Sequence, residues 1–249
     1  TQRIYVWFDA FNIYQSGVGF GWDDKKYKKW WPADLQVIGK GIVRFHAIYW
    51  PAFLLSAGLK LPKKLFVHEY FTVNGQKMSK TLGNVYDPNI AIEKFSADAL
   101  RYFCLAKISP FQDGDLSEEK LLEAYNADLA NGLGNLVARV AKLCEQHGIS
   151  GSSDLNQWNN NVVKFLEEYK FNEALGVIWH EIGDLDRLIN QDKPWELKGE
   201  ELEPKLRTYV SVIQRIAYNL APFLPETAEK ILKQFSGKIK SQPPLFPRI

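Results

Sequence analysis

Residues 74–84 read NGQKMSKTLGN and separate two differently patterned stretches of this 249-residue chain. The extended run before them, residues 65–73, ends at their Asn-Gly pair, which is a strong signal for a tight turn. Residues 87–107, which follow, have a helical pattern. Lys77 and Lys80 stand three residues apart between glycines, so both can move over a polyphosphate and offset its negative charge. The stretch is therefore a candidate phosphate-binding loop.

The chain before this loop alternates buried strands with a helix. Residues 4–8 and 35–38 are short apolar runs typical of buried strands, and a Gly-Lys-Gly sequence leads from the second run into a helix that ends near Gly58. A strand, a helix and a further strand in this order predict a parallel α/β sheet. A doubly wound nucleotide-binding fold needs two such halves, whereas the sequence shows one and has no GxGxxG or Walker-type glycine loop. We therefore expect residues 1–68 to be the second half of a Rossmann-type domain, with the first half missing.

The chain after residue 115 is expected to be entirely helical. Ser117 is followed by two glutamates, which is the pattern of a capped helix start, and an apolar stripe at helical spacing continues to Gly148. Short loops between the later helices favour antiparallel neighbours, and thus a bundle. The predicted fold class is α/β plus all-α. Its units are the half Rossmann sheet (1–68), a connecting region with the candidate loop (69–115), a helical bundle (116–236) and an extended tail (237–249).

Charge is distributed unevenly between the two ends of the chain, although the net charge is only +2. Residues 1–115 hold 15 Lys and Arg against 10 Asp and Glu, a net charge of +5, whereas residues 116–249 have a net charge of −3. Bulk electrostatic attraction to a nucleic acid is thus expected in the first part alone. If the helical part reads RNA, it must do so with a few well-placed side chains.

The two cysteines, Cys104 and Cys144, stand in apolar helical contexts and without a CxxC motif. This pattern excludes a zinc site built from cysteines and favours two reduced core thiols. No apolar run reaches the ~18 residues of a membrane span, and no signal-peptide pattern is present. We expect a cytoplasmic protein with no membrane partner.

The candidate loop resembles the second signature loop of the class I aminoacyl-tRNA synthetases, here KMSKT. The flanking segments are similar to those of the methionyl-tRNA synthetases, and they occur in the expected order along essentially the whole chain. These segments are YVWFDA (5–10), VIGKGIVRFH (37–46), VHEY (67–70), DLANGLGN (128–135) with Arg139, and KPW (193–195). The chain is thus similar to the C-terminal half of a methionyl-tRNA synthetase, without the HIGH-type motif and the zinc-bearing insert.

The resemblance implies roles for the residues around the signature loop. Lys77 and Lys80 would be the catalytic lysines that hold the phosphates of ATP. Met78, Ser79 and His68 would complete the ATP-binding set, with Mg²⁺ accompanying ATP and no metal bound by the chain itself.

A second group implied by the resemblance lines the methionine pocket. It comprises Trp7, Tyr14, Ile42 and His46. An aromatic wall with an aliphatic neighbour suits a flexible thioether, and His46 would donate towards the sulfur or orient a tyrosine. The alternative is that Trp7 and Ile42 are core residues and that His46 is a helix histidine with a local partner.

A third group implied by the resemblance binds the anticodon. Asn135 and Arg139 are four residues apart and so share a helical face, and Trp195 would complete the site. An amide, a cation and an aromatic ring suit splayed single-stranded bases. The alternative is that Arg139 pairs with an acid on the bundle surface and that Trp195 is a hydrophobic plug.

Four positions depart from the family pattern. Gly41 stands where Asp is usual, Glu69 replaces Gly before the signature loop, Phe11 replaces a smaller residue, and Thr81 replaces Ser. The Gly41 departure puts the polar network around the adenylate in doubt, and together with Glu69 it favours a non-catalytic alternative.

The resemblance implies a methionine–tRNA ligase, an enzyme that joins methionine to its tRNA through an ATP-derived adenylate. Its partners would be methionine-accepting tRNA, ATP, methionine and the missing N-terminal half, without which adenylate formation is not expected. One alternative is a non-catalytic tRNA-binding module derived from a synthetase. Another is a leucyl or valyl enzyme, which would not explain the three anticodon residues.

Overall fold

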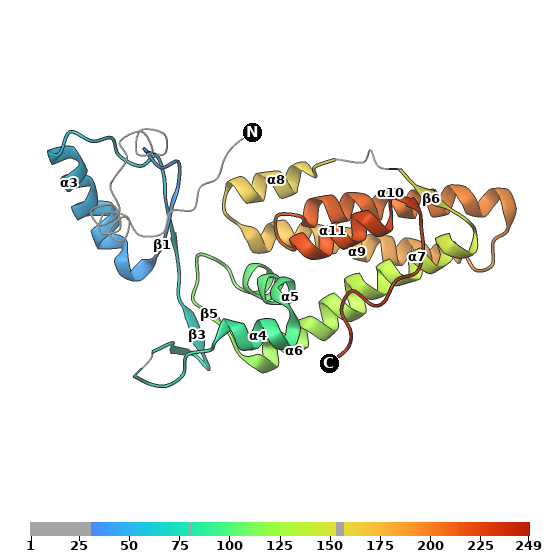
Figure 1. Cartoon of the computed structure of the whole chain (residues 1–249), viewed down its shortest axis with the longest axis horizontal. Helices are drawn as coiled ribbons and strands as arrows, with labels where there is room; N and C mark the ends of the chain where they lie inside the picture. The colour runs from blue at the N-terminus through green and yellow to red at the C-terminus, as the bar shows by residue number, and fades with distance from the viewer. Residues whose placement is uncertain (1–30, 80, 153–156) are drawn as a thin grey trace, which may run out of the picture. The chain divides into compact units, whose positions relative to one another are not determined.

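The computed structural model describes residues 31–79, 81–152 and 157–249, and divides the chain into two compact units, Thr1–Tyr70 and Phe71–Ile249 (Figure 1). Trp7, Phe11, Tyr14 and Lys80 lie outside the described residues. In the described part no helix is long and apolar enough to cross a membrane.

The first unit contains a parallel pair of strands joined by a helical crossover. Strand β1 (Gln36–Gly39) pairs with β2 (Leu65–His68) in register from Gln36↔Leu65 to Gly39↔His68. The crossover begins as two short turns and continues as α3 (Trp50–Ser56); the turns are a 3₁₀ turn at Lys40–Ile42 and a π-helical turn at Phe45–Tyr49. It ends at Gly58, whose φ of +67° lies in the left-handed region that glycine enters at no steric cost. The expected strand, helix and parallel strand are thus confirmed.

The second unit begins with a small sheet of order β4-β3-β5. Its strands are β3 (Phe71–Val73), β4 (Gln76–Lys77) and β5 (Gly114–Asp115). Strand β3 pairs antiparallel with β4 and parallel with β5, so the predicted turn at Asn74-Gly75 is a hairpin turn. The sheet therefore connects the candidate loop to the start of the helical region.

The helical pattern over residues 87–107 forms three pieces and not one helix. They are α4 (Pro88–Phe95), α5 (Ala97–Tyr102) and a π-helical turn (Phe103–Lys107). Ser96 has a φ of +98°, which a right-handed helix does not accommodate, and its hydroxyl accepts a hydrogen bond from the Ala99 amide at 3.3 Å. Ser96 therefore ends one helix and caps the next.

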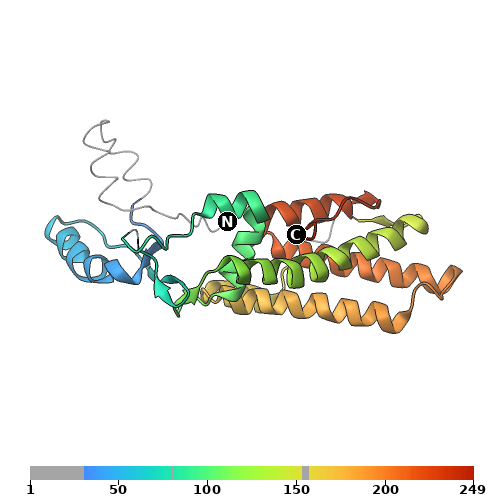
Figure 2. The same cartoon turned by 90° about the horizontal axis from the view of Figure 1, so that it is seen from below.

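Helices pack around one core in the rest of the second unit, and the longer ones run side by side (Figures 1 and 2). Ser117 caps the first through a 3.3 Å hydrogen bond from the Lys120 amide to its hydroxyl, as the sequence predicted. The elements are α6 (Glu118–Ala124), a π-helical stretch (Tyr125–Gly134), α7 (Asn135–Gln146), α8 (Asn160–Glu167), α9 (Phe171–Asp192), a 3₁₀ turn (Gly199–Glu201), α10 (Leu202–Leu220) and α11 (Pro225–Gln234). Cys144 is buried in this core and Cys104 is half-buried, and burial raises the pKa of the two free thiols to about 12 and about 11.

The tail after α11 is extended but packs into the core. Its strand β7 (Gly237–Lys238) pairs antiparallel with β6 (Ser150–Gly151). Ile239 and Phe246 are 1% and 5% exposed, and the Tyr125 hydroxyl donates to the Pro247 carbonyl at 2.8 Å. The tail therefore contributes apolar side chains to the bundle as well as crossing its surface.

Helix α5 is joined to the far end of the chain by side-chain hydrogen bonds. The buried Asp98 carboxylate accepts from the Thr227 amide at 2.7 Å in the first turn of α11. Arg101 donates to the carbonyls of Phe223 and Pro222, just before α11, at 2.7 and 2.9 Å. Segments more than 120 residues apart in sequence thereby form one unit.

Candidate functional site

A tight hairpin turn presents the signature loop. Asn74 and Gly75 have φ values of 52° and 74°, and this left-handed pair matches the twist of the flanking strands. Lys77 lies opposite Thr72 across the hairpin, at the point where strand β4 ends. The hairpin thus sets the direction in which the main chain enters the loop.

Asp115 fixes the base of this hairpin, a role that no motif in the sequence indicates. Its Oδ1 accepts from the Gly75 amide at 2.8 Å and from the Thr72 hydroxyl at 2.9 Å, while Oδ2 accepts from Lys120 Nζ at 2.8 Å. The Gly75 hydrogen bond, followed by that of Lys120, lowers the pKa of the carboxyl to about 2. Asp115 is therefore ionised at neutral pH and joins the loop's entry to α6.

Asn84 holds the loop itself. Its Oδ1 accepts from the Ser79 amide at 2.8 Å, and its Nδ2 donates to the Lys77 carbonyl at 3.2 Å. The Leu82 amide closes a turn onto the Ser79 carbonyl at 3.1 Å, and Met78 packs against the core of the second unit. The described part of the loop is thus held in shape by its own side chains. In the sequence, the position of Asn84 directly after Leu-Gly, at the end of the signature loop, is the signal that could have indicated this role.

We expect Asn84→Ala to release the Ser79 amide, because the variant removes both hydrogen bonds of this side chain. A hydrogen bond of this kind contributes ~0.5–1.5 kcal/mol net, so amide exchange at Ser79 should accelerate by up to about tenfold. Hydrogen exchange followed by NMR measures this rate. Asn84→Asp is the matched control, because it keeps the acceptor for Ser79 and loses only the donor to Lys77. Unchanged exchange at Ser79 in Asn84→Ala would contradict the role of Asn84.

In the first unit, side chains gather at the carboxyl ends of β1 and β2. His68 Nδ1 donates to the Glu69 carbonyl at 2.9 Å, so in neutral His68 the Nε2 atom is an acceptor. Lys40 forms an ion pair with Glu69, and its ammonium lies 4.6 Å from the centroid of the Tyr70 ring. Ligands of open α/β sheets bind at this edge of the strands, so the location suits a ligand site.

The two departures at positions 41 and 69 belong to this same cluster. A Cβ atom on Gly41 would lie 2.3 Å from the Tyr70 hydroxyl, closer than real contacts allow. The tyrosine hydroxyl therefore occupies the space that an aspartate at position 41 would need. Glu69 supplies a carboxylate nearby, bound to Lys40. The two departures thus lie in one packed group.

Two of the four predicted methionine-pocket residues are described. His46 is 9% exposed and its Nδ1 donates to the Ile42 carbonyl at 3.0 Å, whereas Ile42 itself is 50% exposed. Because Nδ1 carries the proton in this arrangement, Nε2 of a neutral His46 accepts a hydrogen bond and does not donate one. His46 has the local partner that the alternative interpretation required, and Nε2 still has acceptor capacity. Trp7 and Tyr14 cannot be placed beside it, since they lie outside the described residues.

In the second unit, hydrogen bonds join Arg139 to α9, the helix that precedes Trp195. Arg139, on α7, donates to Asp186 Oδ1 at 2.6 Å and to Asn190 Oδ1 at 3.1 Å, and both partners lie on the last turns of α9. The indole of Trp195, three residues after the end of α9, is 58% exposed and does not plug the core. Asn135 is exposed at the start of α7, one turn before Arg139. This ion pair is the alternative to base binding that the sequence left open, but the Arg139 side chain is 27% exposed and its guanidinium has more donors than these two contacts use.

Within the described ranges, no group of three or more His, Cys, Asp or Glu side chains is arranged to hold a metal ion. The signature loop, Arg139 and Trp195 belong to the second unit, whereas His46 and His68 belong to the first.

Comparison with known proteins identifies the family. The family described as tRNA synthetases class I (M) matches residues 1–141, which is more than half of the chain. The chain belongs to the methionyl group of the class I tRNA synthetases. A methionine–tRNA ligase of Thermotoga maritima is 39% identical over 95% of this chain, and one of Clostridium acetobutylicum is 40% identical over 94%.

The fold agrees with this membership. A solved Mycobacterium tuberculosis methionyl-tRNA synthetase in complex with methionyl-adenylate superposes with a TM-score of 0.81 at 32% identity, covering 96% of this chain and 55% of that one. The apo form of the same enzyme gives a TM-score of 0.77. This synthetase chain spans about 40% of the length of the two curated relatives. The names of both relatives are those of methionyl enzymes and not of leucyl or valyl ones.

Proposed function

We propose that this chain supplies the signature loop, part of the methionine pocket and the anticodon site of a methionine–tRNA ligase. The observation that carries the proposal is that one unit holds both the hydrogen-bonded part of the signature loop around Ser79 and an exposed Trp195 that follows the helix to which Arg139 is bound. The similarity to relatives of that name along 94–95% of the chain supports the same function.

The reaction has two steps, and ATP with its Mg²⁺ is a substrate. A methionine carboxylate oxygen attacks the α-phosphate, the bond between the α- and β-phosphates breaks, and pyrophosphate leaves. A terminal ribose hydroxyl of the tRNA then attacks the carbonyl carbon, and AMP leaves. Lys77 and Lys80 would offset the negative charge that moves onto the leaving pyrophosphate. The hydrogen bond from Asn84 to the Lys77 carbonyl would hold the main chain of Lys77 in place for this task.

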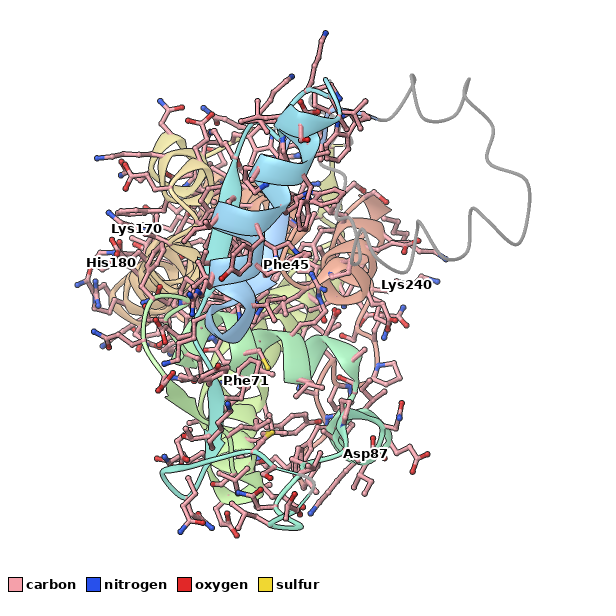
Figure 3. The ribbon with its side chains drawn as sticks, turned by 90° about the vertical axis from the view of Figure 1, so that its left-hand side faces the viewer. Phe45, Phe71, Asp87, Lys170, His180 and Lys240 are labelled. Atoms are coloured by element: carbon pink, nitrogen blue, oxygen red, sulfur yellow. The ribbon has the colours of Figure 1, made fainter. Side chains whose placement is uncertain are left out.

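The first unit would be the second half of a Rossmann-type domain. Its parallel β1–β2 pair with a helical crossover supports this. The exposed apolar side chains of the crossover support it as well. Ile48, Phe53 and Leu55 are 58%, 59% and 64% exposed, and Phe45 on the same segment is labelled in Figure 3. Such a run of exposed apolar side chains is typical of a surface that another polypeptide covers in the assembled protein. We propose that a polypeptide carrying the rest of a class I catalytic domain is the partner that covers it.

The methionine pocket would form around the crossover, with Ile42 and His46 contributed by the described part and Trp7 and Tyr14 by the segment before it. His68, at the end of β2, would face ATP at the carboxyl edge of the strands. The packed Lys40, Glu69 and Tyr70 would take the place of the usual aspartate network.

The helices from residue 116 onward would be the anticodon-binding bundle. Asn135 and Arg139 would hydrogen-bond the edges of unstacked bases, and Trp195 would stack on one of them. Since residues 116–249 have a net charge of −3, binding should depend on the bases and only weakly on phosphate contacts.

Binding of two anticodon stem-loops to the full chain tests this function. One RNA has a CAU loop and the other has the same stem with a scrambled loop, and fluorescence anisotropy gives both dissociation constants. We expect a preference for CAU that persists as salt is raised. Equal affinity for the two loops would contradict anticodon recognition.

A further inference from the structure

The loop that carries Trp195 is anchored at one end to the interior of the bundle. Helix α9 ends at Asp192, and Lys193 follows in the left-handed conformation with φ 45° and ψ 58°, which is disfavoured for a lysine. The Glu196 amide donates to the Lys193 carbonyl at 2.8 Å, so residues 193–196 form a closed turn. Pro194 is buried and Trp195 is exposed. The turn therefore directs the indole outward while the preceding proline points into the protein.

The anchor is a buried phenol–carboxylate pair. The Tyr209 hydroxyl, on α10, donates to Asp192 Oδ2 at 2.6 Å, and the tyrosine is 0% exposed. Lys205, one turn earlier on α10, forms an ion pair with Asp192 Oδ1. Both oxygens of a carboxylate that is only 15% exposed are thereby occupied. A short hydrogen bond to an ionised group is among the stronger bonds available in a protein.

The same region is fixed from a third side by Arg139. Its contacts with Asp186 and Asn190 hold the last turns of α9 against α7. Its positive charge also lowers the pKa of Tyr209, against the larger upward shift caused by burial and by Asp192. The hydrogen bonds of Arg139 and of Tyr209 thus join α7 and α10 to the last turns of α9, just before the Trp195 turn.

We propose that Tyr209 and Asp192 are positioning residues for RNA recognition, which hold the Trp195 turn in the geometry that stacks on a base. This inference rests on the proposed anticodon function and adds a device that the resemblance did not imply. The pair makes no contact with RNA and acts through the indole. A preorganised ring loses less freedom on binding than a mobile one, so base preference should weaken when the anchor is released.

Tyr209→Phe tests this directly, because it keeps the ring in the core and removes only the hydroxyl. We expect affinity for the CAU stem-loop to fall roughly 3- to 10-fold, a fraction of the loss caused by removing a stacking ring, and affinity for the scrambled loop to stay unchanged. In a Trp195→Ala background the same change should have no further effect, because the anchor would have nothing left to position.

Tyr102→Phe is the matched control. The Tyr102 hydroxyl donates to Asp128 Oδ2 at 2.9 Å and is likewise buried, but its ring stacks on Trp179, at about 20 Å along α9 from the Trp195 end. This variant should lower thermal stability about as much as Tyr209→Phe and leave RNA affinity unchanged. Should Tyr209→Phe fail to fold, Lys205→Met removes the ion pair that holds the other oxygen of Asp192 and should give a smaller loss of the same kind.

Three outcomes would overturn the inference. If both Tyr209→Phe and Lys205→Met leave the CAU preference intact, the positioning role of Tyr209 and Asp192 is contradicted, while the proposed anticodon function is not. An equal loss in the presence and absence of Trp195 would show that Tyr209 does not act through the indole. No CAU preference in the unmodified chain would contradict the proposed anticodon function, and the anchor's role with it.

Discussion

The 249-residue chain expressed by itself is expected to give no methionine-dependent ATP–pyrophosphate exchange above background. Adenylate formation requires ATP to be held at its adenine and α-phosphate as well as at its β- and γ-phosphates. The resemblance assigns the first task to a HIGH-type motif, and none of the four histidines stands in one. Lys77 and Lys80 would then act on a nucleotide that nothing orients. Orientation supplies about 7–11 kcal/mol of barrier reduction, so the expected loss is at least about 10⁵-fold.

Isotopic exchange between labelled pyrophosphate and ATP, with and without methionine, measures this activity. The informative second arm adds a folded polypeptide that carries the rest of the catalytic domain, such as the corresponding part of the Thermotoga maritima relative. If exchange recovers and is lost again with Lys77→Ala, this would support the proposal that the added polypeptide holds the adenine and α-phosphate and that this chain holds the β- and γ-phosphates. Robust exchange by the chain alone would show that the expected N-terminal half is dispensable.

Trp195→Ala is expected to weaken binding of the CAU stem-loop by about 1–3 kcal/mol, which is roughly 5- to 150-fold. The indole is 58% exposed on a closed turn, so its removal takes away a stacking surface without opening a core cavity. Thermal stability should therefore change little, while the preference for CAU over the scrambled loop falls.

Trp158→Ala provides the control for this measurement. Trp158 is also exposed in the second unit, at 41%, and its ring lies 4.8 Å from that of Tyr218, but the resemblance gives it no role in binding. It should leave both dissociation constants unchanged. A similar loss in the two variants would indicate non-specific stacking. Unchanged affinity in Trp195→Ala would exclude the indole from recognition.

Local chemistry accounts for what the sequence revealed about the fold. The Asn-Gly turn, the Ser117 cap and the apolar stripe each depend on residues within a few positions of one another, and all three are present. Ser96 shows the limit, because a serine inside a helical pattern gives no sign that its φ will be +98°. Its conformation follows from the packing of two helices whose directions the sequence does not state.

The same limit applies to the candidate site. Lys77, Arg139 and Trp195 were found through motifs, and their roles stay predictions. Asp115 and Tyr209 were missed because each acts across the fold: Asp115 reaches Gly75, 40 residues away, and Tyr209 reaches Asp192, 17 residues away. Partners 40 or 17 residues apart cannot be recognised from the short periodicity of a helix or a strand. Only the pairing of β3 with β5, and the packing of α9 on α10, brings these partners together.

The hydrogen bonds between α5 and the start of α11 also determine when the second unit can be completed during synthesis. Asp98 meets its partner only after Thr227 has left the ribosome, and Tyr125 meets its own only with Pro247, 122 residues later. At translation rates of about 5–20 residues per second, these gaps correspond to roughly 6–25 seconds. The apolar stripe of α6 and α7 is made before α10, which packs on α7 in the same core, has been synthesised. The nascent chain thus offers a defined segment, residues 118–146, to whatever binds unfinished proteins at the ribosome.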